Sequence, residues 1–372
     1  MPDATLRSTV ERLLALADVK IDGDRPWDIR VHDRRLYARV LAGGALGLGE
    51  SYMDGWWDCE RLDEFFTRLL AAELDTKVRP WRDALDVLWA RAVNLQRPGR
   101  AFRIGRHHYD LGNDLFGRML DRRMIYSCAY WKHAGTLDDA QEAKLDLVCR
   151  KLGLRSGMRV LDIGCGWGGT ARFAAERYGV SVVGITVSEE QAKHARRLCE
   201  GLPIEIRLQD YRALTGRFDR VLSVGMFEHV GRKNYGTFMR VVRDLLAADG
   251  LFLLHTIGSN VSVSATDPWV LRYIFPNSML PSARQIGAAI EGRFVLEDWH
   301  GFGPDYDRTL MQWHRNFQQR WPEIAGKYGE RFRRMWRYFL LSSAGGFRAR
   351  KNQLWQIVLS PHGVPGGYVA PR

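Results

Sequence analysis

The chain has 372 residues, which is long for one average domain and comfortable for two. Hydrophobic residues make up 46% of it and charged residues 26%, a globular composition that excludes a disordered protein. No apolar run approaches the ~18–20 residues of a membrane span, and the N-terminal stretch carries acids, so we expect neither a membrane helix nor a secretory signal. The five cysteines form no C-x-x-C pair, which argues against disulfides or a metal site and predicts a reducing, cytoplasmic location.

The net charge of +12 predicts an anionic partner and leaves nucleic acid, a membrane surface and an acidic substrate as alternatives. The excess is concentrated in two short segments. Residues 79–106 hold seven basic and two acidic residues, and residues 311–351 hold ten and two, whereas residues 1–78 hold 11 and 15. Each segment is either a solvated helical face or a docking site, and the charge alone does not decide between them.

Apolar residues keep helical spacing over 10–17 and again over 62–70, which predicts helices in the first part of the chain. Between these stretches the glycines of 41–60 interrupt the periodicity. Further on, Pro98 and Gly99 lie among arginines, as in a linker. We therefore predict a helical domain over 1–100 and a second domain over 101–372.

The pattern changes after residue 150 to short apolar strands separated by amphipathic stretches. Strand-like runs lie at 158–163, 181–185, 204–208, 220–224 and 251–255. This alternation predicts a mostly parallel α/β sheet with crossover helices. A late apolar run, 354–359, is predicted to be a final strand, antiparallel and at the edge of the sheet.

A glycine-rich loop follows the first predicted strand. Gly164, Gly166 and Gly169 satisfy the G-x-G-x-x-G pattern of dinucleotide sites, and Gly168 with the preceding Asp162 also suits S-adenosylmethionine (SAM), which is cationic. A dinucleotide site expects an acid about 20 residues further on, where this chain has threonine and serine. This weakens the dinucleotide interpretation, although the missing acid is also unusual for SAM enzymes.

Several longer motifs resemble those of the cyclopropane-fatty-acyl-phospholipid synthases and their relatives that act on mycolic acids. The likeness covers nearly the whole chain. Its motifs are GESYMDGWW (49–57), HYDLGNDLF (108–116), MIYSCAYW (124–131), VLDIGCGWGG (160–169), SVGMFEHVG (223–231), LLHTIG (253–258) and WVLRYIFPNSMLPS (269–282).

The resemblance implies a Rossmann-like SAM-dependent methyltransferase with a seven-stranded sheet and a smaller N-terminal helical domain. It implies a reaction in which the double bond of an unsaturated phospholipid acyl chain takes the methyl group of SAM, a carbocation forms, and loss of a proton closes a cyclopropane ring. It also implies a homodimer that associates peripherally with the inner membrane from the cytoplasm.

In this family a bound bicarbonate ion serves as the base. Motif by motif, the resemblance places its binding positions at Cys128, Glu228, His255, Ile257 and Tyr306. The chemistry suits these groups, because N–H and O–H groups can donate to the ion and a carboxylate can accept its proton. Each residue alone has a more ordinary interpretation, as a packed cysteine, a core histidine or a helix-start acid, so the joint occurrence carries the prediction.

The SAM-binding positions implied by the resemblance lie before and within the predicted sheet. Besides Asp162, they are Tyr109, Tyr126, Ser127, Gly164, Gly166, Gly168, Thr186, Gln191, Gln209 and Asp210. Aromatic residues including Tyr130, Trp131, Tyr273 and Phe275 are candidates for an acyl tunnel or for plain core. We expect His229 to be structural.

One position departs from the family pattern. Some members carry a cysteine, proposed to be catalytic, before the FRAR motif, and here Ser343 occupies that stretch. An essential thiol there is therefore in doubt.

Two other functions stay open. A methyltransferase of the same fold could stop before ring closure, acting on a fatty acyl carbon or a small amine. The charge alternatively suits an RNA-binding protein, but no RNA-binding motif appears, so we expect no nucleic-acid partner. In the second basic segment, arginines 331, 333, 334 and 337 stand beside Phe332, Trp336 and Phe339, which predicts a surface that docks at the headgroups of an anionic membrane.

Overall fold

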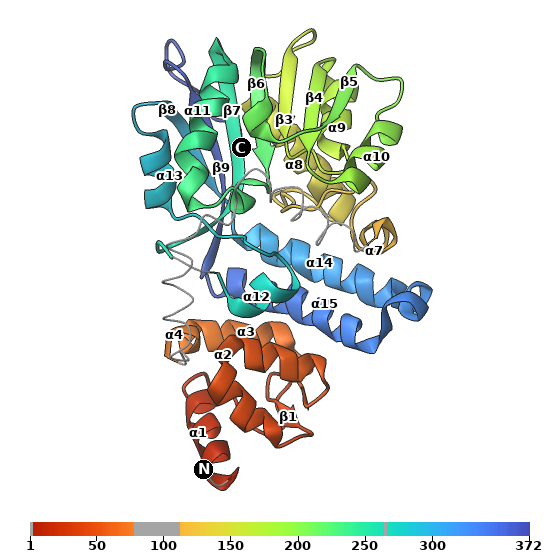
Figure 1. Ribbon diagram of the computed structural model, residues 1–372, viewed down its shortest axis with the longest axis vertical. Helices are drawn as coiled ribbons and strands as arrows, with labels where there is room; N and C mark the ends of the chain where they lie inside the picture. Colours follow the sequence, from red (N-terminus) through yellow and green to blue (C-terminus); the bar gives the residue numbers. More distant parts are fainter. Residues whose placement is uncertain (1–2, 78–111, 264–265) are drawn as a thin grey trace. The chain divides into compact units, whose positions relative to one another are not determined.

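The computed structural model describes residues 3–77, 112–263 and 266–372 (Figure 1). They divide into two compact units. A helical unit takes its residues from 1–93, 264–276 and 306–352, and a sheet unit from 94–263, 277–305 and 353–372. The predicted boundary near residue 100 lies outside the described residues. The structure differs from the prediction over 306–352, which we expected in the second domain and which belongs to the helical unit.

The described residues of the sheet unit form one seven-stranded sheet with the order β5-β4-β3-β6-β7-β9-β8. The pairs β5–β4, β4–β3, β3–β6 and β6–β7 are parallel, and β9–β8 is antiparallel. The predicted mostly parallel, seven-stranded α/β fold is therefore confirmed. The strands are β3 (Arg159–Ile163), β4 (Ser181–Thr186), β5 (Ile204–Leu208), β6 (Phe218–Val224), β7 (Leu246–Ser259), β8 (Val295–Gly301) and β9 (Asn352–Ser360).

The C-terminal strand is not at the edge of the sheet, so that part of the prediction is wrong. Strand β9 lies between β7 and β8, and its residues 354–360 are all buried, as expected for a central strand. The edge strand is β8, which the apolar pattern did not reveal. Its sequence VLEDWHG is mostly exposed or half-buried and therefore has no continuous apolar run.

Apolar cores lie on both faces of the sheet, because successive strand side chains point in opposite directions. Leu161 and Val183 join a core with Phe238, whereas Val160 and Val182 join a second core with Leu145. Helices cover the two faces (Figure 1). The helices of eight or more residues in this unit are α8 (Leu137–Lys151), α9 (Gly169–Tyr178), α10 (Glu189–Leu198), α11 (Tyr235–Leu245) and α13 (Ala283–Ile290).

The helical unit joins N-terminal helices to helices from the C-terminal third of the chain. Its long helix α15 packs against α3 and α2. Gly345 makes the α15–α3 contact close, because a Cβ there would lie 2.7 Å from Phe66 Cβ and 2.9 Å from the Asp63 carbonyl oxygen. The elements are α1 (Asp3–Ala15), α2 (Arg35–Met53), α3 (Leu62–Ala71), α4 (Leu74–Lys77), α12 (Pro268–Tyr273), α14 (Pro304–Arg320), α15 (Ala325–Arg348), β1 (Arg30–Val31) and β2 (Trp57–Asp58).

Helix α2 runs through the glycines that were expected to interrupt it. The helix kinks at Gly44, whose φ of 52° and ψ of −132° are not helical, and continues to Met53. Gly49 lies against the Trp269 ring, where a Cβ would approach Trp269 Cδ1 to 2.3 Å. Here a glycine permits close contact between a helix and an aromatic ring. The periodicity of a single sequence does not distinguish such a glycine from one that lies in a loop.

Charged residues from the two ends of the chain pair inside the helical unit. The acidic side comes from the first 78 residues and the basic side from the segment 311–351. The pairs are Arg331–Asp54, Arg334–Asp58, Arg348–Asp63 and Lys351–Asp75, with N–O distances between 2.7 and 3.5 Å. Much of the positive charge in this segment is therefore balanced within the unit.

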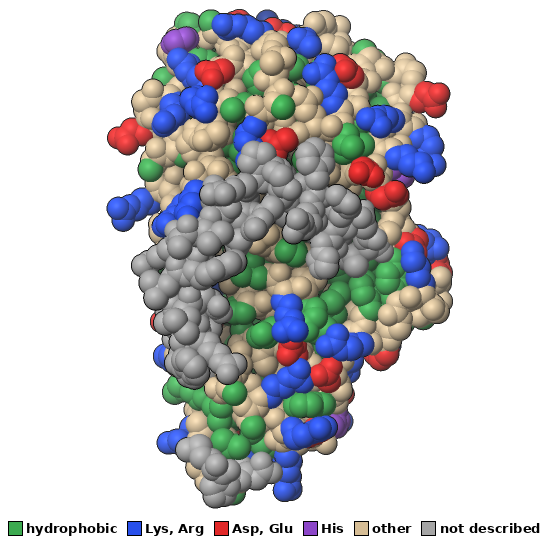
Figure 2. Space-filling model, viewed as in Figure 1, with side chains coloured by type: hydrophobic (Ala, Val, Ile, Leu, Met, Phe, Trp, Pro, Cys, Tyr) green, Lys and Arg blue, Asp and Glu red, His purple; other side chains and the backbone are tan. Residues whose placement is uncertain are grey.

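The predicted headgroup surface over 331–339 is wrong for most of its members. Trp336 and Phe339 are buried, with 0% and 6% of their surfaces exposed. Arg334 donates to the Tyr52 carbonyl, and Arg337 donates to the Cys59 and Glu60 carbonyls. On the face shown in Figure 2, basic and acidic side chains are interspersed. The other basic segment, 79–106, lies outside the described residues.

Among the described helices, none is long and apolar enough to cross a membrane. The five cysteines are all buried and none forms a disulfide.

We expect Gly345→Ala to lower the free energy of unfolding by about 1–3 kcal/mol, because the added methyl group forces α15 away from α3. Gly326→Ala, in the same helix but with open space around the new methyl group, is the matched control and should leave stability unchanged or raise it by up to about 1 kcal/mol. Urea unfolding followed by tryptophan fluorescence measures both. Equal free energies of unfolding for the two variants would show that the close contact between α15 and α3 does not limit the size of the side chain at position 345.

Candidate active site

The glycine loop connects β3 to α9 and turns through left-handed backbone. Gly164, Gly166 and Gly168 have φ values of 88°, 55° and 87°, which residues with a Cβ rarely adopt. The Gly164 and Cys165 N–H groups both donate to the Ile185 carbonyl at 2.9 Å, which ties the loop to β4. The loop therefore exposes backbone beside the start of α9, as a small ligand requires.

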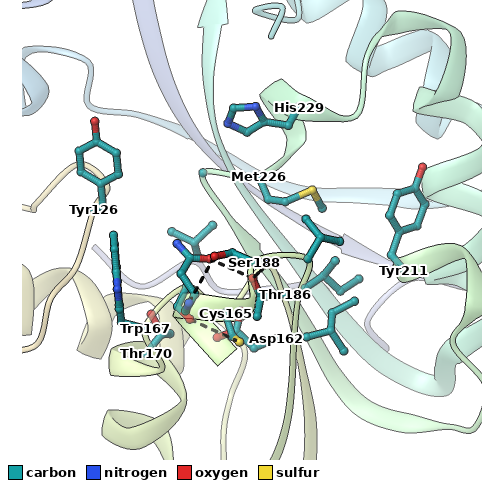
Figure 3. Close-up of a pocket in the computed structure, with 18 of the residues that line it drawn as sticks. Tyr126, Asp162, Cys165, Trp167, Thr170, Thr186, Ser188, Tyr211, Met226 and His229 are labelled. Atoms are coloured by element: carbon teal, nitrogen blue, oxygen red, sulfur yellow. Dashed lines mark hydrogen bonds between the residues drawn. The ribbon is translucent and has the colours of Figure 1, made fainter. Parts of the chain in front are cut away.

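A pocket opens above this loop (Figure 3), and most of the predicted SAM positions line it. Tyr126 and Trp167 lie along one side, Tyr211 lies on the opposite side, and His229 lies on the far side from the loop. Met226 packs against the loop itself, since a Cβ at Gly164 would lie 2.8 Å from Met226 Cβ. The predicted positions in its wall are Tyr126, Ser127, Asp162, Gly164, Gly166, Thr186, Gln191, Gln209 and Asp210.

Two predicted positions are not among the described residues that line the pocket. Gly168 caps the start of α9, and a Cβ there would lie 3.0 Å from Cys199 Sγ, so its contact is with α10 rather than the pocket. Tyr109 lies outside the described residues. His229, which we expected to be structural, lines the pocket, and burial lowers its pKa to about 4, so its ring is neutral.

The end of β4 carries a neutral hydrogen-bonded pair. Thr186 Oγ1 donates to Gln191 Oε1 at 2.9 Å and accepts from the Ser188 N–H at 3.2 Å. Ser188 caps α10 by accepting from the Gln191 N–H at 3.3 Å. These contacts fix amide and hydroxyl groups where an acid was expected for a dinucleotide, and neutral groups of this kind can bind the hydroxyl groups of a ribose.

At the end of β5, Asp210 is already paired. Arg212 binds its carboxylate with two N–O distances of 2.8 and 2.7 Å, and the Arg212 guanidinium lies 5.1 Å from the Tyr211 ring centre. Gln209 donates to the Ala213 carbonyl at 2.8 Å. Sequence patterns missed Arg212, because arginine–carboxylate pairing two residues apart is common on surfaces.

Asp162 is a buried carboxyl group at the end of β3, with 1% of its surface exposed. Burial raises its pKa to about 7, and Lys144 opposes that shift. Its Oδ2 atom has no hydrogen-bond partner among the described residues. A buried acceptor of this kind suits a ligand that carries positive charge or donates hydrogen bonds.

The segment 121–128, whose residues 124–127 line the pocket, is held by buried polar groups. The Asp121 carboxylate accepts from the Ile125 N–H at 2.9 Å, Gln141 donates to the Ser127 carbonyl at 2.8 Å, and Lys144 Nζ lies 3.0 Å from Ser127 Oγ. Gln141 and Lys144 lie three residues apart on α8, both fully buried. The sequence signal for these two residues is their polar side chains on the otherwise apolar face of a helix.

A second set of predicted residues meets at the ends of β6 and β7. Glu228 Oε1 accepts from the Ile257 N–H at 2.7 Å, and His255 Nδ1 lies 3.3 Å from Gln356 Nε2. Glu228 Oε2 and His255 Nε2 are buried without a hydrogen-bond partner in the described part of the chain. Cys128 is fully buried and follows Ser127 in the chain. Ser127 lies next to Gly225, because a Cβ built at Gly225 would be 3.7 Å from Ser127 Cβ. The Gly225 N–H in turn donates to the His255 carbonyl.

The protonation of these groups follows from burial. Burial raises the pKa of Glu228 to about 7, with the Ile257 N–H opposing the shift. Burial, together with Lys144 and Lys151, lowers the pKa of His255 well below its usual value, so the ring is neutral. A neutral imidazole and a carboxyl group that titrates near neutrality can both donate to and accept from a small oxyanion.

Tyr306 and Ser343 belong to the helical unit. Tyr306 lies in the first turn of α14, is 9% exposed, and packs 4.7 Å from the Phe347 ring. Ser343 lies inside α15 and is half-buried. The predicted role of Tyr306 toward the sheet-unit residues stays a prediction. Of the aromatic candidates, Tyr130 packs on Phe302, and the Tyr273 hydroxyl donates to Glu50.

Within the described residues, no group of three or more His, Cys, Asp or Glu side chains is arranged to hold a metal ion.

The strand order, the glycine loop and the pocket at the strand ends define a methyltransferase of the SAM-dependent fold class. The mycolic acid cyclopropane synthetase family matches residues 96–357. The chain belongs to that family, as its motifs indicated.

Three comparisons show how far the likeness extends. The chain is 55% identical over 373 residues to a cyclopropane-fatty-acyl-phospholipid synthase of Escherichia coli, covering 100% of this chain and 97% of that protein. It is 40% identical over 266 residues to a probable fatty acid methyltransferase of Pseudomonas putida, covering 68% and 67%. A crystal structure of mycolic acid cyclopropane synthase CmaA1 complexed with SAH and CTAB matches with a TM-score of 0.65 and 34% identity, covering 69% of this chain and 97% of that one.

We expect Glu228→Gln to raise the free energy of unfolding at pH 8.5 by about 1–3 kcal/mol relative to the native chain, and to change it little at pH 5. The raised pKa means that the folded state favours the protonated carboxyl group, so the native chain loses stability as the pH rises from about 4.5 through about 7. Glutamine removes that loss. Thermal unfolding at the two pH values measures it, and an equal effect at both would contradict a buried, titrating Glu228.

Proposed function

We propose that this protein transfers a methyl group from SAM to the cis double bond of an unsaturated acyl chain in a membrane phospholipid and closes a cyclopropane ring. The overall change adds CH2 to the lipid, turns SAM into S-adenosylhomocysteine and releases one proton. The observation that carries the proposal is the buried set beside the pocket in which the Ile257 N–H holds Glu228 Oε1. Glu228 Oε2 and His255 Nε2 have no hydrogen-bond partner among the described residues, so a small ligand with both donor and acceptor groups would satisfy them.

When bound, SAM supplies the methyl group as an electrophile. Asp162, with its unpartnered Oδ2, would hold the positively charged end of such a ligand or its amino group. Thr186 and Gln191 would bind the ribose hydroxyls, and Gln209 and Asp210 would face the adenine edge. Tyr126 and Trp167 form an aromatic wall of the pocket, and aromatic faces stabilise cations by about 0.5–2 kcal/mol each.

When bound, bicarbonate supplies a base that removes a proton and is not itself methylated. Glu228 Oε2 and His255 Nε2 fit such an ion, because both are buried polar atoms without a partner in the described residues. Glu228 would accept a hydrogen bond from it, and His255 would orient it as a neutral donor. Cys128 and Tyr306 complete the set that we propose from the family likeness.

This set favours ring closure over simple methylation. Methylation of an amine needs no base that removes a proton from the transferred methyl group, so a buried, uncharged acid–base pair beside the pocket would have no role there. Methylation of an acyl carbon with retention of the alkene stays the second candidate, since the Pseudomonas putida relative at 40% identity is a probable fatty acid methyltransferase.

We also propose that the protein works as a homodimer, bound peripherally to the inner membrane from the cytoplasm. The support is the family likeness and a substrate that resides in a bilayer. Because arginines of the helical unit are paired with acids of the same unit, they give little support for docking on an anionic membrane. The electrostatic support for this docking comes from the composition of the basic segment 79–106. Flotation with anionic vesicles across a salt series tests this, with an RNA oligonucleotide as the competing ligand. Binding to RNA but not to vesicles would overturn the membrane partner.

The direct test incubates the protein with SAM and vesicles of an unsaturated phospholipid. We expect the acyl chain to gain 14 Da and to become resistant to ozonolysis, with cyclopropane protons upfield in the NMR spectrum. Mass alone does not decide, because a methylated alkene is isomeric with the ring. A product of the same mass that ozone still cleaves would reject ring closure in favour of carbon methylation.

We expect His255→Ala to lower turnover by about 100-fold or more while the Kd for SAM changes less than about threefold, because His255 serves proton removal and not cofactor binding. Lipid mass spectrometry and isothermal titration with SAM measure the two quantities. His362→Ala is the matched control, since His362 is exposed in the same unit. Near-normal turnover of the His255 variant would remove the anion-site assignment.

A further inference from the structure

Helix α8 presents two lysines to the protein interior. The side chains of Lys144 and Lys151 are both 0% exposed, and both are among the largest fully buried side chains. Seven positions separate them, which is two helical turns, so they lie on one face. Lysine is rarely buried completely, so two buried lysines on one helix face need an explanation.

Lys144 is close to the proposed anion site. Its Nζ lies 3.0 Å from Ser127 Oγ, and Ser127 precedes Cys128 and approaches Gly225. Gly225 in turn donates to the His255 carbonyl at 2.9 Å. The charged or titratable groups that face Lys144 are Asp121, Asp162, Cys128 and Cys149.

Lys151 is linked to the same site through residues of β8 and the segment that follows it. Its Nζ lies 3.0 Å from Asp298 Oδ2 and 3.1 Å from His300 Nδ1. Arg372 also binds Asp298, so these two cations share one carboxylate and leave one net positive charge. The His300 ring lies 5.0 Å from Phe302, whose ring lies 5.9 Å from His255.

The sheet-unit groups proposed to touch bicarbonate carry no positive charge. They are a cysteine, a carboxyl group, a neutral imidazole and a backbone N–H. An anion moved from water into a buried site needs a compensating charge, and an ionised Glu228 would repel it. Lys144 and Lys151 both act electrostatically on His255, so the positive potential of α8 reaches this position.

We propose that Lys144 and Lys151 are positioning residues that supply the positive potential holding bicarbonate beside Glu228 and His255, without touching the reacting atoms. The proposal rests on the proposed function, since it concerns the same anion. The alternative is purely structural: Lys144 holds the pocket wall through Ser127, and Lys151 holds β8 through Asp298. Replacement by glutamine separates the two, because glutamine can still donate a hydrogen bond but has no charge.

The test titrates the full-length protein, without SAM, with 13C-labelled bicarbonate at pH 7 and follows NMR line broadening. At this pH both lysines are protonated, since burial lowers each pKa only to about 8. We expect Lys144→Gln and Lys151→Gln to weaken bicarbonate binding by about tenfold or more. Arg150→Gln is the matched control: it removes a cation from the exposed face of α8 and should change affinity less than about twofold.

The outcomes are distinct. Native-like affinity in both folded glutamine variants would overturn the role of the lysines and leave the bicarbonate assignment intact. Absence of binding to the native protein would overturn that assignment, and this inference with it. If Lys144→Gln does not fold by circular dichroism, Lys151→Gln decides alone. As a second readout, the bicarbonate concentration that half-saturates ring formation, at saturating SAM, should rise by the same factor.

Discussion

The carboxyl ends of four neighbouring parallel strands determine where the site lies. Strands β4, β3, β6 and β7 run in the same direction and therefore end at one edge of the sheet. Asp162, Thr186 and Gly225 line the pocket at the ends of β3, β4 and β6, and His255 lies on β7 opposite the end of β6. Hydrogen bonding between the strands fixes the spacing of these groups, so one rigid framework serves both the cofactor pocket and the proposed anion site.

Burial of polar groups is the second determinant of this site. Asp162, Glu228, His255 and Lys144 are all nearly or completely buried, and each has a pKa displaced from its usual value. Each displacement favours the uncharged form, so the protein by itself resists accumulating charge in this part of its interior. A cationic ligand beside Asp162 and an anionic ligand beside Glu228 would supply the charges that the protein lacks. Ligand binding and protonation are therefore coupled at this edge of the sheet.

Much of this arrangement was accessible from the sequence, and the exceptions have physical reasons. Six of the seven strands were predicted because each carries a short apolar run, and β8 was missed because it is a half-exposed edge. Most of the predicted cofactor positions line one pocket, because the motifs preserve residues at strand ends. Gln141 and Lys144 were missed because their function depends on a wall segment that is local in space but distant from any motif. The docking surface was misplaced because composition counts charges without showing which acids pair with them.

The helical unit has a consequence for how the chain is made. Its N-terminal helices bury their apolar faces against α15, which ends at Arg348, near the end of the chain. Synthesis on the ribosome proceeds from the N-terminus, so α2 and α3 emerge long before their packing partner exists. Until then, Phe66 lacks the α15 residue Tyr338, whose ring lies 5.0 Å from its own in the folded chain. Helices α2 and α3 therefore complete their packing only after α15 has been synthesised, and a ribosome that stalls before α15 would release a chain in which these helices expose apolar faces.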